Sequence, residues 1–568
     1  MIFAPKSGKI SSYAIRDFSG FKTTVKKESA FIMRKQTKIA AIVSAAALLA
    51  IGASMTSFAA TSWEYSGDNR FYLDDAGNMA TDSLIEDNDD YYYVDANGAM
   101  VRNRWVAIDN ESAGEDNQPD VWWYYFQANG KAYKNSHASG TIFKRVINGK
   151  TYCFDEDGKM QYGWVKKDDG VTDYDDNAYQ EAEYYFGDEN DGAMSIGWRE
   201  IALSDVADAE DEQPGDSYWD SDQVRWFYFK ASGAKQTSST NKTINGRKYG
   251  FDQYGRMIAD WHNNSLGAAT YQNASRRGSS NNAASTATAS YAKDFMYFSS
   301  PEDGARFTKG WFKVVPGYYL NYADYDNGTD RWYYADGNGN LYAGQIKTIK
   351  GKKYAFDLKG GMIYGLALLR TDGSTIYEYA DNENKYDSQD KFMETARNMS
   401  SDWAFYYFSD NEDKDGSMKT GTQKISLDGE SFSFNFKKGG TKKGQGVTGM
   451  SEKKYYLGGM LLTADADNKI EVVNKTTLEK ITVSKLISDL GLTGVDASKK
   501  IGQANKGDVI YTNTGVDTDG ANLTALTGNY VVVNVSGTVV KSGSKVDGDG
   551  FKVVLDGNNN IKQIIAAN

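Results

Sequence analysis

The chain has 568 residues, with 64 Lys and Arg against 76 Asp and Glu, which gives a formal charge of -12. Aromatic residues make up 14% and include 40 Tyr, while the chain has 57 Gly, two His and one Cys. One cysteine excludes an intrachain disulfide and a multi-cysteine zinc site, two histidines argue against a histidine-based triad, and the acidic balance argues against nucleic acid as a partner.

The first 59 residues predict export. Residues 33–38 are basic, residues 39–51 are apolar and rich in Ala, and Ser57-Phe58-Ala59 supplies small residues for signal peptidase. Together, 33–59 are typical of a signal peptide, and the apolar run is too short to favour the alternative of a membrane anchor. We therefore expect a secreted chain that starts at residue 60 or 61, with no membrane span in the mature chain. We interpret residues 1–32 as a misassigned upstream start, with translation beginning at Met33.

The rest of the chain is built from a repeat in which glycine is followed two residues later by methionine. Aromatic runs precede these glycines, and an Asp often stands three residues before the turn glycine. The Gly/Met pairs are Gly77/Met79, Gly98/Met100, Gly158/Met160, Gly192/Met194, Gly255/Met257, Gly360/Met362, Gly416/Met418 and Gly458/Met460. An aromatic run alternates faces as a strand does, and Asp and Gly are the residues that close a tight turn. Each copy therefore predicts one β-hairpin.

A lone hairpin is not stable in water, so the hairpins must bury their aromatic faces against neighbours. We predict an all-β solenoid of stacked β-hairpin repeats, without helices of more than about two turns in the repeat frame. Long polar insertions interrupt it, which we interpret as solvated loops; they include residues 109–120, 168–181, 204–222 and 263–290. Residues 411–416 approach a calcium loop but lack its closing Glu, so a calcium site is the alternative there.

The combined pattern resembles a known family. The pairs Gly163-Trp164, Gly197-Trp198 and Gly310-Trp311, with runs such as Trp123-Tyr124-Tyr125-Phe126, are similar to the cell-wall-binding repeats of Gram-positive surface proteins. That family includes choline-binding modules and the related glucan-binding and clostridial-toxin repeats. The resemblance covers about residues 61–463, and it implies a hairpin solenoid that binds wall polymers or sugars in aromatic pockets between hairpins.

The C-terminal part departs from this pattern. We assign residues 60–463 to the cell-wall-binding-type repeats and 464–568 to a small, mostly β domain with one helix over 478–490. Residues 530–540 and 551–565 resemble degenerate repeats in which Val replaces the aromatic residues, and Val cannot build an aromatic cage.

Three segments hold one aromatic arrangement, which we predict as ligand-binding. Each has a leading Trp, a second Trp seven residues before the turn glycine of a long repeat, and a Tyr six residues before the glycine of the next short repeat. The sets are Trp105/Trp123/Tyr152, Trp198/Trp226/Tyr249 and Trp311/Trp332/Tyr354. Three electron-rich faces can hold a quaternary ammonium by cation–π attraction or stack on the C–H faces of a sugar. The competing interpretation is that these rings are only core.

Two further observations qualify these pockets. Trp164 and Trp261 lack the second Trp and Leu366 replaces the leading one, so we expect those repeats to bind poorly. Position five before the short-repeat glycine, where the family has a second Tyr, is Cys153, Gly250 or Ala355. If the third wall comes from that position, the cages are open and a flat sugar is favoured over choline.

We therefore expect a non-catalytic protein of the cell surface, attached non-covalently to the wall through a polymer of the teichoic-acid type, by its choline or its sugar. No catalytic residue, metal or cofactor is predicted. One alternative is a host-glycan adhesin or toxin-like receptor-binding protein that uses the same pockets. A wall hydrolase with a catalytic C-terminus is less favoured, because residues 464–568 contain no His, Cys or Trp and the region is short.

Overall fold

The computed structural model describes residues 62–115, 118–136, 141–175, 177–203, 224–263, 289–317, 320–380, 386–409, 415–489, 491, 505–512, 526 and 528–567. The predicted signal peptide, 33–59, and residues 1–32 lie outside these ranges. The chain divides into two compact parts, described separately. The first part ends at Val106 and also contains Tyr125–Tyr133, and the second comprises Ala107–Tyr124 and the chain from Lys134 onward.

The first part is made of short antiparallel hairpins. Strand β1 (Ser62–Ser66) pairs with β2 (Asn69–Leu73), and β3 (Ser83–Asp87) pairs with β4 (Asp90–Val94). The Asp of each turn accepts backbone N–H groups as the sequence predicts: Asp74 Oδ1 accepts from the amides of Ala76 and Asn78 at 2.9 and 2.8 Å. These bonds and the left-handed glycine close the turn locally, so each hairpin can form from its own sequence.

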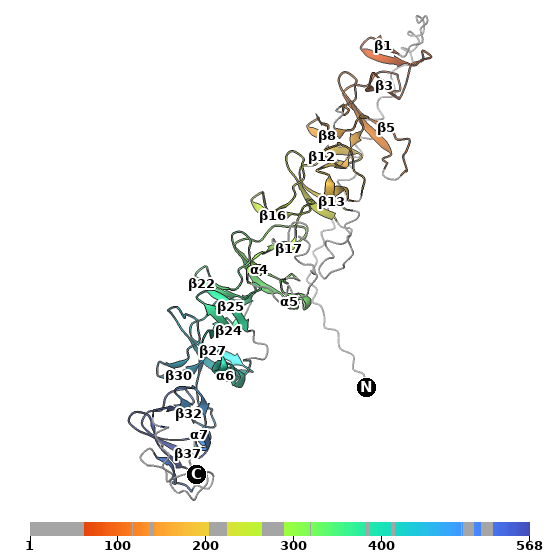
Figure 1. Cartoon of the computed structure of the whole chain (residues 1–568). Helices are drawn as coiled ribbons and strands as arrows, with labels where there is room; N and C mark the ends of the chain where they lie inside the picture. The colour runs from red at the N-terminus through yellow and green to blue at the C-terminus, as the bar shows by residue number, and fades with distance from the viewer. Residues whose placement is uncertain are drawn as a thin grey trace, which may run out of the picture. The chain divides into compact units, whose positions relative to one another are not determined.

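The second part continues the same pattern, and its hairpins follow one another in chain order (Figure 1). Their strands are β7 (Lys144–Ile147) with β8 (Lys150–Phe154), β10 (Gly163–Val165) with β11 (Tyr184–Asp188), β13 (Gly197–Ala202) with β14 (Val224–Phe229), β15 (Ser239–Ile244) with β16 (Arg247–Phe251), β17 (Asp260–Asn263) with β18 (Phe295–Phe298), β19 (Gly310–Val314) with β20 (Arg331–Ala335), β21 (Gln345–Ile349) with β22 (Lys352–Phe356), β24 (Gly365–Asp372) with β25 (Thr375–Ala380) and β26 (Trp403–Phe408), β27 (Gly421–Leu427) with β28 (Glu430–Phe436), and β29 (Gly449–Ser451) with β30 (Lys454–Leu457). Strands β5 (Arg104–Asp109) and β6 (Val121–Phe126) extend across the boundary between the two parts, and β9 (Met160–Gln161), β12 (Asp191–Met194), β23 (Met362–Ile363) and β31 (Met460–Leu461) are short additions.

Helices are few among the described residues, and they lie in the connections. They are α2 (Ala178–Glu181), α4 (Ala289–Lys293), α5 (Tyr322–Asp326), α6 (Gln389–Asn398) and α7 (Val483–Asp489). Helix α6 has 10 residues, longer than the two turns we expected, because Ser388 caps it and it buries Phe392, Met393 and Ala396 beside β30 (Figure 1). None of the described helices combines the length and the apolarity needed to cross a bilayer.

A column of side chains explains why the repeat needs both Gly and Met. The Met two residues after one turn glycine packs where the next turn glycine lacks a Cβ: a Cβ on Gly98 would lie 2.6 Å from Met79 Sδ, and one on Gly233 would lie 2.2 Å from Met194 Sδ. The same contact recurs in both parts of the chain. Each glycine thus has two functions: it closes its own turn, and it leaves space for the Met of the preceding hairpin. We call the position of this Met, two residues after a turn glycine, the column position.

Backbone hydrogen bonds connect neighbouring hairpins at the same place. The amide of the column residue donates to a carbonyl of the preceding hairpin, as Met257 N does to Trp226 O at 2.8 Å and Met100 N does to Arg70 O at 2.7 Å. These bonds and the column contacts fix the spacing from one hairpin to the next within each part. The all-β hairpin-repeat fold predicted from the sequence is confirmed.

The C-terminal residues form two small sheets. One orders β33 (Lys480–Ile481), β32 (Ile470–Asn474) and β35 (Tyr530–Asn534), and the other orders β34 (Val509–Thr512), β38 (Ile561–Ala566), β37 (Phe551–Leu555) and β36 (Gly543–Val546). Helix α7 begins at Val483, later than the 478 we expected, because β33 takes the residues before it. The column continues here: a Cβ on Gly537 would lie 2.8 Å from Leu461.

Candidate ligand-binding pockets

The second predicted set forms one aromatic cluster. Trp198 on β13 lies opposite Tyr228 on β14, and Trp226 lies two residues before that Tyr, opposite Glu200. The centroids of the Trp198 and Trp226 rings are 6.3 Å apart with their planes at 83°, and Tyr249 of β16 lies 4.8 Å from Trp198 at 66°. Trp198 therefore meets one ring of its own hairpin and one of the next hairpin at steep angles.

The third predicted set repeats this geometry. The Trp311 and Trp332 rings are 6.4 Å apart at 83°, and Tyr354 lies 4.9 Å from Trp311 at 66°. Tyr334, opposite Trp311 in the hairpin, lies 5.1 Å from it at 81°. Because centroid distances and angles agree closely with those of the second set, the two clusters are the same structure built twice.

The first predicted set is divided between the two compact parts. Trp105 lies in the first part, where its ring is 5.2 Å from that of Tyr125 at 71°. The leading Trp of each other set has a similar contact with the Tyr opposite it. Trp123 and Tyr152 belong to the second part, where Trp123 is half-buried and Tyr152 is buried. Each of these residues thus has the local setting of its counterparts.

Exposure separates these sets from the other tryptophan repeats. The leading residues Trp105, Trp198 and Trp311 are half-buried, whereas Trp164 and Trp261 are 9% and 3% exposed. Trp261 also donates its Nε1–H to Val315 O at 2.8 Å, as an ordinary core indole does. The leading indoles of the three sets therefore expose ring surface that Trp164 and Trp261 bury. Poor binding by the Trp164 and Trp261 repeats stays a prediction.

We call the position of the second Trp, such as Trp226, the second-ring position. It is defined by strand pairing, because it lies two residues before the Tyr that pairs with the leading residue. Distance from the turn glycine does not define it. Trp164 faces Tyr185 and Trp261 faces Tyr297, so their second-ring positions are Glu183 and Phe295. The turns of these two hairpins are longer by two residues than that of Trp198, and counting from the glycine points to Tyr185 and Tyr297 instead. The sequence count therefore works only where the turns have equal length.

The Tyr that we assigned as the third wall contacts the leading Trp in the second and third sets, and the position after it lies on the opposite strand face. Cys153 and Ala355 are fully buried and Gly250 is buried, on the strand face opposite Tyr152, Tyr249 and Tyr354. Cys153 Sγ donates to Gly170 O at 3.3 Å, and burial raises the pKa of its thiol to about 12, as for a structural cysteine. The position that would have left the cages open thus lies in the core, away from the Trp and Tyr rings.

The column residue of the following hairpin packs into each cluster. Met257 is in the cluster with Trp198 and Trp226, and Met362 is in the cluster with Trp311 and Trp332. The indole Nε1 atoms of Trp123 and Trp332 are buried without a hydrogen-bond partner among the described residues. Because these two side chains are otherwise half-buried, the surface that they expose is ring carbon.

An ion pair recurs beside the Tyr of each set. The cation two residues before the Tyr pairs with the Asp that precedes the next turn glycine. The pairs are Lys150–Asp191 at 2.7 Å, Arg247–Asp303 at 2.6 Å and Lys352–Asp415 at 3.1 Å. Such exposed pairs contribute little to stability, typically about 0–1 kcal/mol. They place one carboxylate beside the strand that carries the Tyr of each set.

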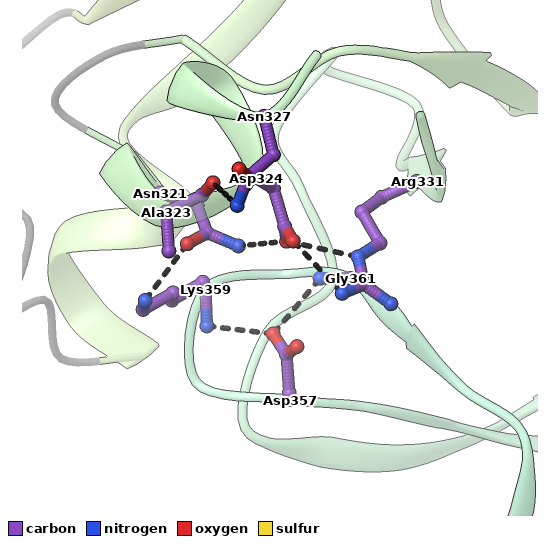
Figure 2. A network of polar contacts seen from close by, with 8 residues as sticks. All are labelled: Asn321, Ala323, Asp324, Asn327, Arg331, Asp357, Lys359 and Gly361. Carbon is purple, nitrogen blue, oxygen red and sulfur yellow. Dashed lines mark hydrogen bonds and ion pairs between the residues drawn. The ribbon is translucent and has the colours of Figure 1, made fainter. Parts of the chain in front are cut away.

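A polar network orients the strand that carries Trp332 (Figure 2). Arg331, its neighbour, donates from Nε and a terminal nitrogen to the carboxylate of Asp324 on α5, at 2.8 and 2.9 Å. Lys359 of the next hairpin donates to Asn321 Oδ1 at 2.9 Å, and its amide donates to the turn residue Asp357 at 2.8 Å. The insertion between β19 and β20 is thus fastened both to the start of β20 and to the next turn.

A lysine replaces Met in the column beside Trp164. Lys235 is buried, its Nζ donates to Tyr179 O, and the same Nζ lies 5.2 Å from the centroid of the Trp164 ring. Burial lowers the pKa of Lys235 to about 8, although the carboxylates of Asp252 and Glu183 act in the opposite direction; Arg256 lowers it further. This repeat holds its own ammonium ion against the tryptophan.

A lysine whose pKa is lower in the folded than in the unfolded chain makes stability rise with pH. Between about pH 8 and the ordinary lysine pKa of 10.5, the unfolded chain binds more protons than the folded chain. The free energy of unfolding of the wild type should therefore rise with pH across that window. The full difference is on the order of 3 kcal/mol. The variant Lys235→Met should be more stable than wild type at pH 7 and should lose this advantage as the pH approaches 10.

The measurement is local hydrogen exchange or urea unfolding of both proteins from pH 7 to 10. The exposed Lys230→Met is the matched control and should change by less than about 0.5 kcal/mol at any pH. A constant difference between Lys235→Met and wild type across the range would contradict the prediction.

Comparison with known proteins identifies the repeat. Residues 60–105 match the choline-binding repeat. Glucosyltransferase-S of Streptococcus mutans is 27% identical over 192 residues, which are 34% of this chain and 10% of that enzyme. The match thus spans about a tenth of the length of this curated relative. The predicted resemblance to choline-binding and glucan-binding repeats is confirmed.

Solved structures with similarity include choline binding protein F of Streptococcus pneumoniae, at 17% identity over 69% of this chain and 100% of that one, with a TM-score of 0.35. Another is the modular autolysin LytC of the same organism in complex with a synthetic peptidoglycan ligand, at 14% identity over 73% of this chain and 54% of that one, with a TM-score of 0.19. A third is alternansucrase in complex with isomaltononaose, at 16% identity over 64% of this chain and 19% of that one, with a TM-score of 0.18.

Proposed function

We propose that this chain is a secreted, non-catalytic protein that binds a cell-wall polymer through aromatic pockets between neighbouring hairpins, and that the bound group is a quaternary ammonium such as choline. The observation that carries the proposal is a repeated corner of two half-buried indoles and a Tyr, Trp198/Trp226/Tyr249 and Trp311/Trp332/Tyr354, with matching distances and angles. The set Trp105, Trp123 and Tyr152 is divided between the two compact parts and stays a prediction from the sequence.

The ring geometry favours a compact cation over a flat sugar. A sugar needs a platform on which to lie, whereas rings at 83° and 66° form the walls of a corner. A quaternary ammonium presents methyl groups to several faces at once, and each face contributes about 0.5–2 kcal/mol. It also requires no hydrogen bond, in agreement with the buried Nε1 of Trp332.

One similarity supports this class of ligand. Residues 60–105, which include the leading Trp105 of the first set, match a choline-binding repeat. Non-covalent attachment to the wall follows from binding through pockets, and the signal peptide at 33–59 supports secretion. The second candidate, binding of host glycans as an adhesin or toxin-like protein, would use the same rings. The match to Glucosyltransferase-S favours a sugar as its ligand.

The proposal is tested by sedimentation of the mature chain with purified cell walls that contain choline, alongside a glycan array. We expect retention on these walls and release by free choline, with no comparable signal on the array. Retention that free choline does not reverse, but that soluble glucan does, would replace the ammonium ligand with a sugar. A signal on host glycans without wall binding would favour the second candidate.

A further inference from the structure

The first hairpin contains the same corner of rings, although it is not among the predicted sets. Trp63 on β1 lies opposite Tyr72 on β2. Its ring is 5.0 Å from that of Tyr72 at 67°, and 5.0 Å from that of Tyr92 on the next hairpin at 63°. The corresponding values around Trp198 are 5.3 Å at 71° and 4.8 Å at 66°. The leading ring, the opposite Tyr and the ring of the next hairpin are therefore all present.

The column residue is present as well. Met100 packs in one cluster with Trp63, Tyr72 and Tyr92. Its amide donates to Arg70 O at 2.7 Å, as Met257 N donates to Trp226 O in the second pocket. This hydrogen bond shows that Arg70 occupies the second-ring position, where the predicted pockets have Trp.

Arg70 places its charge over the leading ring of the corner. Its guanidinium carbon lies 4.7 Å from the centroid of the Trp63 ring and 5.2 Å from that of Tyr65, the residue opposite it in the hairpin. Its Nε is buried, and within the described residues this atom has no hydrogen-bond partner. The aromatic faces are thus the neighbours of this cation, as they would be for a bound ammonium group.

A second repeat shows the same occupation from a different position. The Trp164 ring lies 5.0 Å from Tyr185 at 68° and 5.0 Å from Phe227 at 69°, which is the same corner again. Its second-ring position is Glu183, and the column residue is Lys235, whose Nζ lies 5.2 Å from the Trp164 centroid. Here the internal cation is the ammonium group of the column residue, Lys235. It donates a hydrogen bond to the carbonyl oxygen of Tyr179 on helix α2.

We propose that the Trp63 pocket is a quaternary-ammonium site that the chain fills with its own Arg70, and that the Trp164 pocket is filled in the same way by Lys235. Arg70 excludes the ligand because a guanidinium and a quaternary ammonium need the same ring faces. The number of ligands that the chain binds is then set by the second-ring and column residues, and not by the number of tryptophan repeats. The inference deepens the proposed function and rests on it for the identity of the ligand.

The test counts bound choline on the mature chain by equilibrium dialysis. We expect three sites in wild type and four in Arg70→Trp, which restores the residue that the predicted pockets carry. Arg70→Ala, which only empties the corner, should also gain a fourth, weaker site. The matched control Arg70→Lys keeps an internal cation and should remain at three. An unchanged count in folded Arg70→Trp and Arg70→Ala would overturn the proposal, as would a fourth site in Arg70→Lys.

A ligand-free measurement separates this inference from the proposed function. If wild type binds no choline, the proposed function fails, and the internal cation is then judged by a double-mutant cycle of Arg70→Met and Trp63→Leu. Amide exchange in β1 to β4 reports the opening of these hairpins. We expect the two changes to be non-additive by roughly 2- to 30-fold in the opening constant. Additive effects would show that the guanidinium is not held by the ring.

Discussion

Replacing Trp123, Trp226 and Trp332 together by Leu should abolish retention of the mature chain on choline-containing walls while leaving its hairpins folded. These residues are the second Trp of each of the three predicted sets. Leu keeps apolar volume where the side chains pack against the core but removes the π face. Each lost cation–π contact weakens a pocket by about 0.5–2 kcal/mol, or roughly 2- to 30-fold. Because three pockets act on one polymer, the losses multiply through avidity, which can reach about 10²–10⁴.

Wall sedimentation measures this loss, and near-ultraviolet circular dichroism with protease resistance checks the fold. The matched control is Trp403→Leu. Trp403 is also half-buried, but it packs in the core of β24 to β31 rather than in a ring pocket. The control should lose stability and keep wall binding. A folded triple variant that still binds walls would remove the three pockets from the proposed function, and unfolding of the triple variant alone would favour the interpretation of these rings as core.

The variant Gly446→Ala should open the hairpins around β28 to β31, although the repeat pattern has Met at this position. A Cβ on Gly446 would lie 2.3 Å from the carbonyl oxygen of Gly458 and 2.6 Å from its carbonyl carbon. These are backbone atoms, and Gly458 itself is tightly packed, since a Cβ there would lie 3.0 Å from Phe405. Neither backbone segment can shift without displacing packed atoms. We therefore expect the free energy of unfolding of these hairpins to fall by about 3 kcal/mol, at the upper end of the cost of overpacking.

Local hydrogen exchange is the suitable measurement, because a series of hairpins need not unfold in one step. The amide of Gly446, which donates to Phe405 O at 2.7 Å, should lose its protection. Gly439→Ala is the control in the same hairpin, since a Cβ there meets nothing within 4 Å, and it should cost less than about 0.5 kcal/mol. Equal protection in the two variants would show that the backbone contact at Gly446 can relax.

The ring clusters show where counting along the sequence succeeds. Trp198, Trp226 and Tyr249 meet as expected because each belongs to a hairpin whose turn has the standard length. Counting fails at Trp164, where two extra residues in the turn shift the register and place Glu183 at the second-ring position. The first hairpin was missed because Arg70 is not aromatic; the pairing of Trp63 with Tyr72 could have revealed it.

The sequence by itself determined the hairpin and its repetition, because turns closed by Asp and Gly and strands with alternating faces are decided within some twenty residues. Only the tertiary structure showed which rings remain half-exposed, because exposure depends on the neighbouring hairpin and on the insertion that covers it. Helix α2 closes the corner of Trp164, whereas Trp311 stays half-buried. The sequence shows Met at the column position as a pattern. The space that this Met fills is left by a glycine of the next hairpin, so it forms only where two hairpins are in contact.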